Sequence, residues 1–339
     1  GVSRATFDAA FRGVGPDNDV LSRATSQPEF SRAIWDYLDD MAAESRIATG
    51  REMLVRHRAL LDSIEATYGV NREIVVAIWG MESSYGAILR DPTKVKNVVR
   101  ALATLGWRGG SRAAYGRQQL NAVLRILEHH DVDARHMTGS WAGAMGQTQF
   151  IPTTYLSYAV DFDGDGRRNI WTSVPDALAS TANYLRKSGW QPGATWGYEV
   201  VLPPGFDSSL EGRSATLADW AARGFARASG AAFPRPDDQA TLLLPDGPGG
   251  PASLTLRHLQ ATTRSTNANA YALGVGHLAD RLAGGGPFVT PWPRGYTPLD
   301  EAGRAELQSR LKAIGFPLDK IDGKVGPETI VAIRSFEQQ

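Results

Sequence analysis

The sequence contains no cysteine, so its 339 residues cannot form disulfide bridges, thiolate metal sites or a cysteine nucleophile. It also has no excess charge of either sign, because 36 Lys and Arg residues balance 36 Asp and Glu residues. A protein that binds nucleic acid is usually more basic, so we expect no nucleic-acid partner. No apolar run approaches the roughly 18 residues of a membrane-spanning helix, and we expect no transmembrane segment. These absences are typical of an ordinary soluble globular protein.

The first residues, Gly1 to Arg4, include neither an initiating methionine nor the features of a signal peptide. We therefore interpret the sequence as processed or trimmed, which leaves open a removed export signal or lipid anchor. Its length exceeds the size at which one hydrophobic core stops growing efficiently. We expect two or more folding units.

Helical periodicity dominates residues 17–190. Apolar residues recur at three- and four-residue steps, for example in Phe30–Met41 and Met53–Tyr68. The first half of the chain is therefore predicted to be mostly α-helical.

Two short strands are predicted after Trp190, over Tyr198–Leu202 and Ala240–Leu244, each bounded by Pro and Gly. A small β-containing insert over about 191–253 is the simplest interpretation. A helical pattern then returns from Leu254 through Leu282. The predicted fold class is α+β, mainly α.

The strongest linker signal is a Gly- and Pro-rich stretch, 284–298, which cannot continue a helix. We expect a first unit over 1–285, a linker over 286–298 and a small domain over 299–339. The last of these is so short that its core must be minimal.

One carboxylate, that of Glu82, is predicted at the end of an apolar helix. Asn71 can cap this helix, Glu73 is well placed in its first turn, and Gly86 is the expected stop. The helix dipole and the poor solvation by preceding apolar residues both raise the pKa of Glu82. An acid that stays protonated near neutral pH can protonate a glycosidic oxygen. The alternative is a structural carboxylate that pairs with an Arg or caps a backbone amide.

A segment rich in small residues, Gly139–Pro152, permits close approach of the backbone to a neighbour. Its residues Gln147, Thr148 and Gln149 offer amide and hydroxyl groups suited to sugar hydroxyls and acetamides. The segment is interpreted as one wall of a groove. The alternative is a tight helix–helix crossing with a polar rim.

An acidic loop follows, in which three aspartates at alternate positions precede a glycine at the sixth, as in an EF-hand calcium loop. The twelfth position is Thr172 instead of glutamate, and a downstream aspartate is near enough to close a longer loop. The predicted metal ligands are Asp161, Asp163, Asp165, Arg167 and Asp176. The alternative is a set of aspartates that only form Asx-turns.

Five segments occur in the order found in a known family: Gln27–Phe30, Glu82–Gly86, Gly139–Pro152, Asp161–Gly166 and Asn183–Leu185. Together they strongly resemble the B-type lytic murein transglycosylases, over roughly residues 5–285. Several linked motifs are far more specific than any one alone. The resemblance implies a lysozyme-like helical core with an inserted β-containing subdomain.

The resemblance also implies a reaction. Members of this family cleave the β-1,4 bond between N-acetylmuramic acid and N-acetylglucosamine without water and leave a 1,6-anhydromuramoyl end. Glu82 would be the sole acid/base: it protonates the leaving oxygen and then accepts the proton of the attacking C6 hydroxyl. No catalytic cofactor is implied, and calcium would be structural.

The same resemblance implies a set of residues that face sugar or peptide. These are Tyr37, Arg112, Tyr115, Ser140, Gln149, Tyr184 and Tyr271. Aromatic faces suit the apolar faces of pyranose rings. The alternative for each tyrosine is a partly buried core residue, and this interpretation is favoured for Tyr115.

The tail resembles the small three-helix peptidoglycan-binding domain, mainly through the turn Asp322–Pro327 and the helix-capping residue Thr329. Its implied role is to hold the enzyme on its substrate. The implied partners are glycan strands and other cell-wall enzymes, and the implied location is the periplasm, in association with the outer membrane if a lipid anchor was removed. Two alternatives stay open: a hydrolytic muramidase, and a murein-binding scaffold without activity.

Overall fold

The structure is a computed structural model that describes residues 1–25, 32–256, 268–295 and 299–337. The predicted motif Gln27–Phe30, residues 257–267 of the helix predicted from Leu254 to Leu282, and the last three linker residues, 296–298, lie outside this part of the chain. None of the helices in the described ranges combines the length and the apolar character that a membrane span needs.

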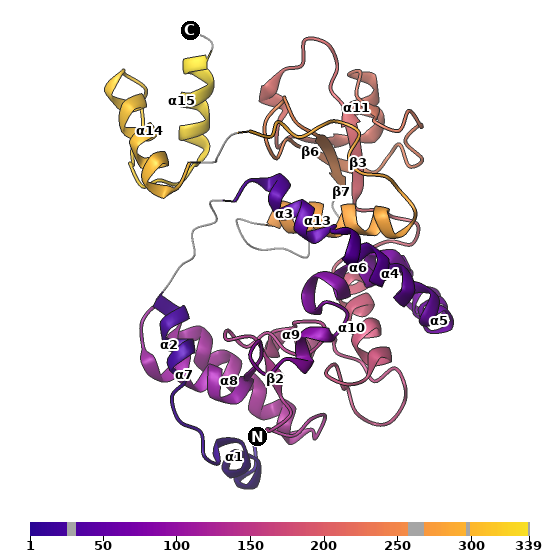
Figure 1. Ribbon diagram of the computed structural model, residues 1–339, viewed down its shortest axis with the longest axis vertical. Helices are drawn as coiled ribbons and strands as arrows, with labels where there is room; N and C mark the ends of the chain where they lie inside the picture. Colours follow the sequence, from indigo (N-terminus) through magenta and orange to yellow (C-terminus); the bar gives the residue numbers. More distant parts are fainter. Residues whose placement is uncertain (26–31, 257–267, 296–298, 338–339) are drawn as a thin grey trace.

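Helices dominate the fold (Figure 1). Before the sheet they are α1 (Arg4–Phe11), α2 (Asn18–Thr25), α3 (Ile34–Met41), α4 (Glu44–Arg56), α5 (Arg58–Tyr68), α6 (Arg72–Ser83), the 3-10 helix η1 (Ala87–Arg90), α7 (Val98–Arg108), α8 (Ala113–Glu128), α9 (Pro152–Tyr158) and α10 (Val174–Lys187). Within and after the sheet they are the 3-10 helix η2 (Ser208–Leu210), α11 (Leu217–Ala222), α13 (Ala268–Leu282), α14 (Glu301–Ala313) and α15 (Pro327–Glu337). A two-stranded antiparallel pair, β1 (Lys96–Asn97) and β2 (Thr138–Gly139), flanks α7 and α8 in the chain.

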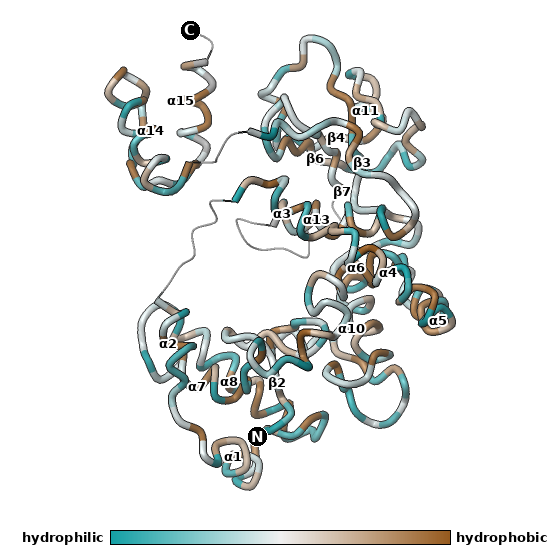
Figure 2. The backbone as a smooth tube through the Cα atoms, viewed as in Figure 1, coloured by the Kyte–Doolittle hydropathy of each residue, from teal (hydrophilic) through white to brown (hydrophobic). Residues whose placement is uncertain are grey.

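The helices form two packed groups with separate hydrophobic cores. In the first group α6 packs against α4, α10 and α13, and α13 also packs against α3. Residues Ile74–Gly80 of α6 are all buried, and Figure 2 shows this helix as one of the most hydrophobic stretches. In the second group α7 and α8 pack on each other and against α1, α2 and α9. The predicted mainly helical core is confirmed.

One predicted helix, Met53–Tyr68, is interrupted. α4 ends at Arg56 and α5 begins at Arg58, with His57 as the residue between them. The imidazole of His57 lies edge-on to the indole of Trp79, with ring centroids 5.8 Å apart. The break therefore places the His57 side chain against Trp79 of α6.

The predicted β-containing insert is a five-stranded antiparallel sheet in the order β4-β6-β7-β3-β5. The strands are β3 (Gly197–Val201), β4 (Ser214–Thr216), β5 (Ala226–Arg227), β6 (Gln239–Leu243) and β7 (Ala252–Leu256). β3 and β6 match the two predicted strands within a residue. The sheet has its own core around the fully buried Trp220.

The helix predicted from Leu254 to Leu282 is wrong at its beginning, because Leu254 belongs to the central strand β7. β7 pairs with β6 on one side and β3 on the other, and all five of its residues are buried. In β7 Ser253 and Thr255 alternate with Leu254 and Leu256, which is the two-residue period of a strand, although the polar side chains are buried as well. The leucines alone also fit the helical spacing that continues further along the chain. α13, which carries the rest of the predicted helix, is described from Ala268.

The stretch predicted as a linker packs against the first helical group. We call residues 286–294 the strap. Its aromatic residues Phe288 and Trp292 lie against the core formed by α3, α6 and α13. Two aromatic side chains in contact with a core are incompatible with a free spacer, so the boundary between the units is structured on its N-terminal side.

Polar contacts fix the strap to two further elements. The carboxylate of Glu199 in β3 accepts the backbone N–H groups of Val289 and Thr290, at 2.9 and 2.8 Å. Arg294 forms an ion pair with Asp39 of α3 at 2.8 Å. The strap thus connects the sheet to the helical core.

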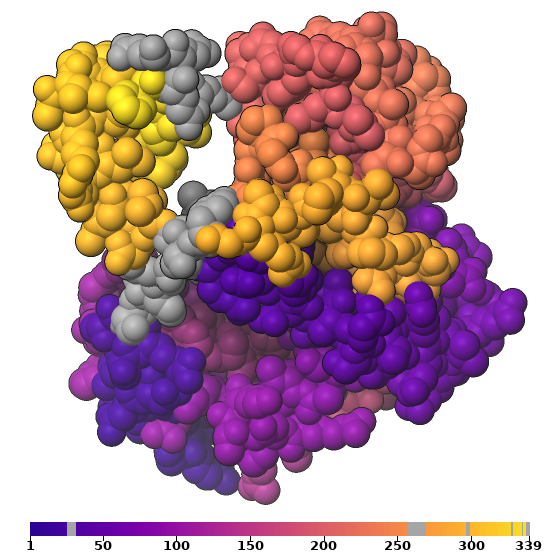
Figure 3. Space-filling model, turned by 45° about the horizontal axis from the view of Figure 1, so that its top comes forward, coloured from indigo at the N-terminus to yellow at the C-terminus, as the bar shows by residue number. Residues whose placement is uncertain are grey.

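The tail forms a separate lobe, yellow in Figure 3, with a core of Leu311, Leu318 and Ala332. Its residues within 299–337 contain two helices, α14 and α15, and not the three that were predicted. The buried amide of Gln308 accepts the N–H groups of Asp322 and Gly323 and donates to Lys324 and Thr329. The hydrogen bonds of this one side chain therefore stabilise the predicted Asp-Gly turn in a lobe whose apolar core is small.

Candidate active site

The helix that carries Glu82 ends earlier than predicted. α6 runs from Arg72 to Ser83, and the chain then turns through Ser84, Tyr85 and Gly86 with φ of 50°, 58° and 80°. Left-handed backbone is unfavourable for Ser and Tyr, so surrounding contacts must hold it. Gly86, the predicted stop, is the third residue of this turn.

Tyr85 supplies the contacts that hold the turn. Its hydroxyl donates to the backbone carbonyl of Arg46 in α4, at 2.8 Å. Its ring fills the space beside two glycines, because a Cβ at Gly50 or Gly80 would overlap the phenol. The Arg46 guanidinium also donates to the Gly80 carbonyl near the end of α6, at 2.5 Å. The turn is thereby fixed to α4, and with it the direction of Glu82.

Asn71 is the N-cap residue of α6, as predicted, but its side chain makes no capping bond. Its Oδ1 atom is buried and has no hydrogen-bond partner in the described part of the chain. Glu73 lies in the first turn, as predicted. The expected side-chain cap is therefore wrong although the helix start is right.

Glu82 lies in the last turn of α6, and its side chain is partly accessible. Burial raises the pKa of its carboxyl from 4.5 to about 7, the direction predicted from the sequence. A hydrogen bond from the Tyr271 hydroxyl to Oε1, 2.6 Å long, opposes this rise. Among the described residues no other acid affects the pKa of Glu82. The group is poised between its protonated and ionised forms near neutral pH.

Three predicted tyrosines gather at this carboxyl. Burial, the Glu82 charge and the neighbouring Tyr37 and Tyr184 all raise the pKa of Tyr271 well above its usual range. Burial and the Glu82 charge also raise the pKa of Tyr37 to about 12. The ring of Tyr184 packs edge-on to Tyr158, with centroids 5.0 Å apart. Tyr37 and Tyr271 therefore stay neutral hydroxyl donors beside one acid, and Tyr184 lies close enough to Tyr271 to affect its pKa.

The Gly-rich segment Gly139–Pro152 is a series of tight turns and not a helix, so the alternative of a helix–helix crossing is wrong. The Ser140 hydroxyl accepts the backbone N–H groups of Ala142 and Ala144, at 3.3 and 3.1 Å. A Cβ at Gly139 would overlap the Ala144 carbonyl, which explains why glycine is required there. Small residues here serve close packing of backbone on backbone.

Two polar residues of this segment do not face outward as predicted. Gln147 is 5% exposed, and its amide accepts from Trp79 Nε1 at 2.9 Å and donates to the Trp171 carbonyl at 3.2 Å. Thr148 is buried as well. Gln147 therefore connects α6 to the Gly-rich segment, and a Cβ at Gly86 would lie 2.7 Å from its Oε1 atom.

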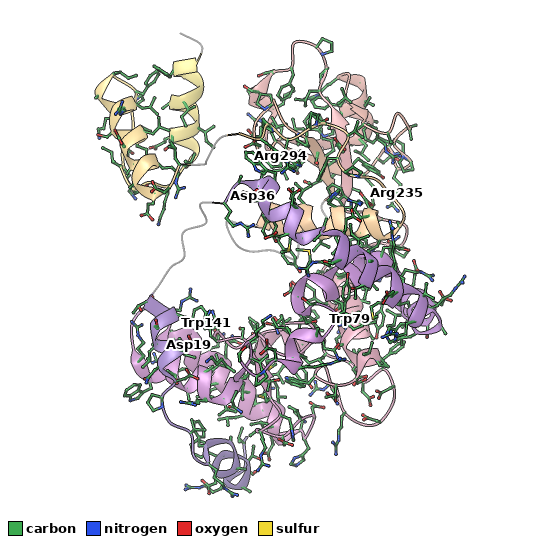
Figure 4. All side chains as sticks on the ribbon, viewed as in Figure 1. Asp19, Asp36, Trp79, Trp141, Arg235 and Arg294 are labelled. Atoms are coloured by element: carbon green, nitrogen blue, oxygen red, sulfur yellow. The ribbon has the colours of Figure 1, made fainter. Side chains whose placement is uncertain are left out.

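The remaining predicted residues lie on or beside the Gly-rich segment. The Arg112 guanidinium lies over the ring of Trp141, 5.1 Å from its centroid. The Tyr115 hydroxyl donates to the Ala142 carbonyl at 2.9 Å, and its ring packs against the second core. Gln149 is partly accessible and donates to the Gly146 carbonyl at 2.8 Å. Figure 4 places Trp79 and Trp141 in the two helical groups.

Part of the predicted acidic cluster forms. Carboxylate oxygens of Asp161, Asp163 and Asp176 lie within 4.8 Å of one another. Asp176 is fully buried and accepts backbone N–H groups from Phe162 and Asn169, each at 2.7 Å, and from Asp163 at 3.3 Å. Three carboxylates so close repel one another unless a cation lies between them, and oxygen ligands of this kind suit calcium.

Two predicted ligands lie outside this cluster. The side chain of Asp165 accepts the backbone N–H of Arg167 at 2.9 Å, and neither residue contributes an atom to the three-carboxylate group. Thr172, at the twelfth position of an EF-hand, is exposed and accepts from Asn169 at 2.6 Å. Asp165 thus makes the hydrogen bond of an Asx-turn, and the metal roles of Asp165 and Arg167 stay predictions.

Sequence reasoning missed the contacts that position Glu82. The Trp79–Gln147 bond and the Arg46–Gly80 bond join residues far apart in the sequence, and no local pattern predicts them. For the strap a signal was present: Phe288 and Trp292 are large aromatic residues in a stretch otherwise rich in Gly and Pro.

Comparison with known proteins gives one family match. The family model described as transglycosylase SLT domain matches residues 1–280. The membrane-bound lytic murein transglycosylase B of Escherichia coli (strain K12) is 30% identical over 274 residues, which are 79% of this chain and 72% of that protein.

Solved structures agree. SltB3 from Pseudomonas aeruginosa, in complex with NAG-anhNAM-pentapeptide, is 48% identical with a TM-score of 0.92, over 100% of this chain and 90% of that one. The Escherichia coli lytic transglycosylase Slt35, in complex with calcium, is 28% identical with a TM-score of 0.68, over 83% of this chain and 87% of that one.

Proposed function

This chain belongs to the transglycosylase SLT domain family and is a lytic transglycosylase, and from that premise we propose that Glu82 is its single acid/base. The observation that carries the proposal is the carboxyl of Glu82 itself. It lies at a buried helix end, with a pKa of about 7 and one hydrogen bond among the described residues, which comes from Tyr271.

The first step is proton donation. The substrate is peptidoglycan, and the bond that breaks is the β-1,4 bond between N-acetylmuramic acid and N-acetylglucosamine. Tyr271 donates to Oε1 of Glu82, so Oε2 is the atom available to carry the acidic proton. Glu82 gives that proton to the glycosidic oxygen as the bond breaks.

The second step returns the proton. Glu82 is now a carboxylate, and the Tyr271 hydroxyl stabilises its charge. The C6 hydroxyl of the muramoyl residue attacks C1 and transfers its proton to Glu82, which closes the 1,6-anhydro ring. A pKa near the working pH suits a group that acts as acid and base in turn. No water is consumed.

The glycan contacts are part of the same proposal. Tyr37 offers a neutral hydroxyl and a ring face next to Glu82, and Tyr184 offers a ring face near Tyr271. Ser140, Gln149 and Arg112 offer polar groups on the other helical group. The hydrogen bond of Tyr115 to the Ala142 carbonyl instead supports a role in holding the Gly-rich segment.

Product analysis tests the reaction. We expect digestion of purified peptidoglycan to release muropeptides that lack one water relative to the reducing sugars, as detected by mass spectrometry. Reducing products would instead identify a hydrolytic muramidase, which needs a second carboxylate to activate water. Binding without any cleavage would identify a scaffold.

A structural calcium ion belongs to the proposal. Asp161, Asp163 and Asp176 would hold it, and it would compensate their charges without taking part in bond cleavage. We expect a chelator to lower the melting temperature by several degrees and calcium to restore it. Asp163→Asn should abolish this response, whereas Asp165→Asn should keep it.

The tail and the location complete the proposal. We infer that residues 299–337 bind peptidoglycan and keep the catalytic groups near their substrate. We also infer a periplasmic location, in which glycan strands and other cell-wall enzymes are the partners. A chain that lacks the tail should bind insoluble peptidoglycan less tightly in a sedimentation assay while it still cleaves soluble fragments.

A further inference from the structure

A pocket of about 510 Å³ lies where the strap crosses α3 and α13. Its size is within the range of sites for small organic ligands, roughly 300–1,000 Å³. Leu38 of α3 and the C-cap residue Ala42 line it, whereas Tyr37 of the same helix lies near Glu82. The pocket is therefore separate from the residues that perform the reaction.

The wall formed by α13 carries a buried polar side chain. His277 is 8% exposed, and its ring stacks on Phe288 of the strap with centroids 4.2 Å apart. Burial and the charge of Arg281 lower the pKa of His277 to about 4, so the imidazole is neutral near pH 7. Within the described ranges neither ring nitrogen has a hydrogen-bond partner. A neutral imidazole offers one donor and one acceptor to a ligand.

The rim of the pocket pairs each cation with an acid. Arg281, whose side chain is 15% exposed, donates to Oε1 of Glu44 at 2.6 Å, and Arg294 contacts Asp39 at 2.8 Å. Glu44 is 80% exposed, and Asp39 and Arg294 are each 53% exposed, so these bonds contribute little and can be shared with a ligand.

This charge arrangement selects the ligand. A ligand with a single negative charge would meet Asp39 and Glu44, and one with a single positive charge would meet Arg281 and Arg294. A zwitterion finds a partner for each of its charges. The apolar part of the lining, which includes Pro287, suits small aliphatic side chains.

We propose that this pocket binds a short zwitterionic peptide, with the ligand carboxylate at Arg281 and His277 and the ligand amine at Glu44 and Asp39. The identification of this ligand as a peptide freed from peptidoglycan, with its terminal amine and carboxylate both ionised, rests on the proposed function. The preference for a zwitterion rests on the pocket alone. A neutral sugar carries no charge, so it could form an ion pair with neither the cations nor the acids of the rim.

Binding is tested without any cleavage step. The full chain is titrated calorimetrically with D-alanyl-D-alanine, with the same dipeptide blocked at both ends, and with chitobiose. We expect the zwitterion to bind at least about tenfold more tightly than the blocked dipeptide, because each charged hydrogen bond that is lost weakens binding by about that factor. Chitobiose should displace neither dipeptide from the pocket.

Two variants locate the site. His277→Phe keeps the stack on Phe288 but removes both hydrogen-bonding nitrogens, and Arg281→Gln removes the buried cation. Each should raise the dissociation constant of D-alanyl-D-alanine by about tenfold. Arg4→Gln, which breaks an exposed ion pair with Asp8 in α1, is the matched control and should leave it unchanged.

The proposal is overturned if D-alanyl-D-alanine does not bind at about 10 mM, if the blocked dipeptide or chitobiose binds equally well, or if neither variant changes the affinity. Glu82→Gln separates this result from the proposed function. It should bind the dipeptide like the unaltered chain even though it no longer cleaves peptidoglycan, so failure of one proposal leaves the other measurable.

Discussion

Two carboxylates, the partly accessible Glu82 and the fully buried Asp176, show how the same chemical group can serve catalysis or structure. Burial raises the pKa of both. Asp176 accepts three backbone N–H groups, whereas Glu82 accepts one phenolic hydroxyl. Backbone donors fix a carboxylate to the chain around it, while a single hydroxyl leaves one oxygen for another molecule. The donors around an acid therefore indicate its role better than its burial does.

The largest expected effect concerns turnover. Glu82→Gln keeps the size of the side chain but cannot donate or accept the catalytic proton, so we expect the rate of muropeptide release to fall by about 10³-fold. Glu73→Gln, in the first turn of the same helix, is the matched control. Equal rates for Glu82→Gln and the unaltered chain would remove Glu82 from the mechanism.

The converse test concerns Asp176. In Asp176→Asn the amide oxygen can still accept from Phe162 and Asp163, but the amide N–H then faces the backbone N–H of Asn169. We therefore expect a loss of about 2 kcal/mol in the free energy of unfolding. The measurement is denaturant unfolding in the presence of a chelator, which removes any contribution of bound metal. The exposed Asp165→Asn should change stability by less than about 0.5 kcal/mol. Equal losses of stability in the two variants would mean that the backbone hydrogen bonds to Asp176 do not stabilise the fold.

The pH dependence of stability sharpens the contrast. The pKa of Glu82 is about 7 in the folded chain and near 4.5 in the unfolded one, so its protonated form favours folding. This contribution is complete below about pH 4.5 and is lost as the pH rises through 7, and it amounts to about 3 kcal/mol at most.

Glu82→Gln cannot ionise at this position. Its stability, measured by unfolding from pH 4 to pH 8, should match that of the unaltered chain at the acidic end and exceed it at the alkaline end. A constant difference across this range would mean that the pKa of Glu82 is not raised.

The smallest expected effect concerns the hydrogen bond that Tyr271 donates to the Glu82 carboxyl. Tyr271→Phe removes the hydrogen bond that lowers the pKa of Glu82, so the alkaline limb of the pH–rate profile should move to higher pH. The maximal rate should fall by about tenfold, because the carboxylate formed in the first step loses a donor. Tyr68→Phe, remote from Glu82, should change neither. A lower rate with an unmoved profile would assign Tyr271 to substrate binding alone.

The sequence predicts these two carboxylates unequally. For Glu82 the run Ile74–Trp79 placed the acid at the end of a buried helix, and local periodicity was sufficient for that. For Asp176 the EF-hand spacing indicated a metal loop but also favoured Asp165, whose side chain turns back to its own backbone. Which of several aspartates converge depends on how α10 packs, and that is a long-range property.

Other predictions failed as well. Leu254 was assigned to a helix although Ser253 and Thr255 alternate with Leu254 and Leu256, because the leucines alone also fit the helical spacing that continues further along the chain. Gln147 was expected to face sugar, since nothing local reveals that Trp79 and Trp171 enclose its amide. Tight turns such as Ser84–Gly86 are stabilised by distant partners, here Arg46 and α4, so their geometry is not encoded in their own residues.

The strap has a consequence for dissecting the molecule. A cut made at the first glycines after α13, where the composition indicates a spacer, would remove Phe288 and Trp292 from the core and the donors of Glu199 from β3. The remaining fragment would expose apolar surface of the core. Its stability and activity would therefore not represent those of the intact catalytic unit. The shortest fragment that keeps these contacts extends through Arg294. The C-terminal boundary of the catalytic unit therefore lies about ten residues later than the composition indicates.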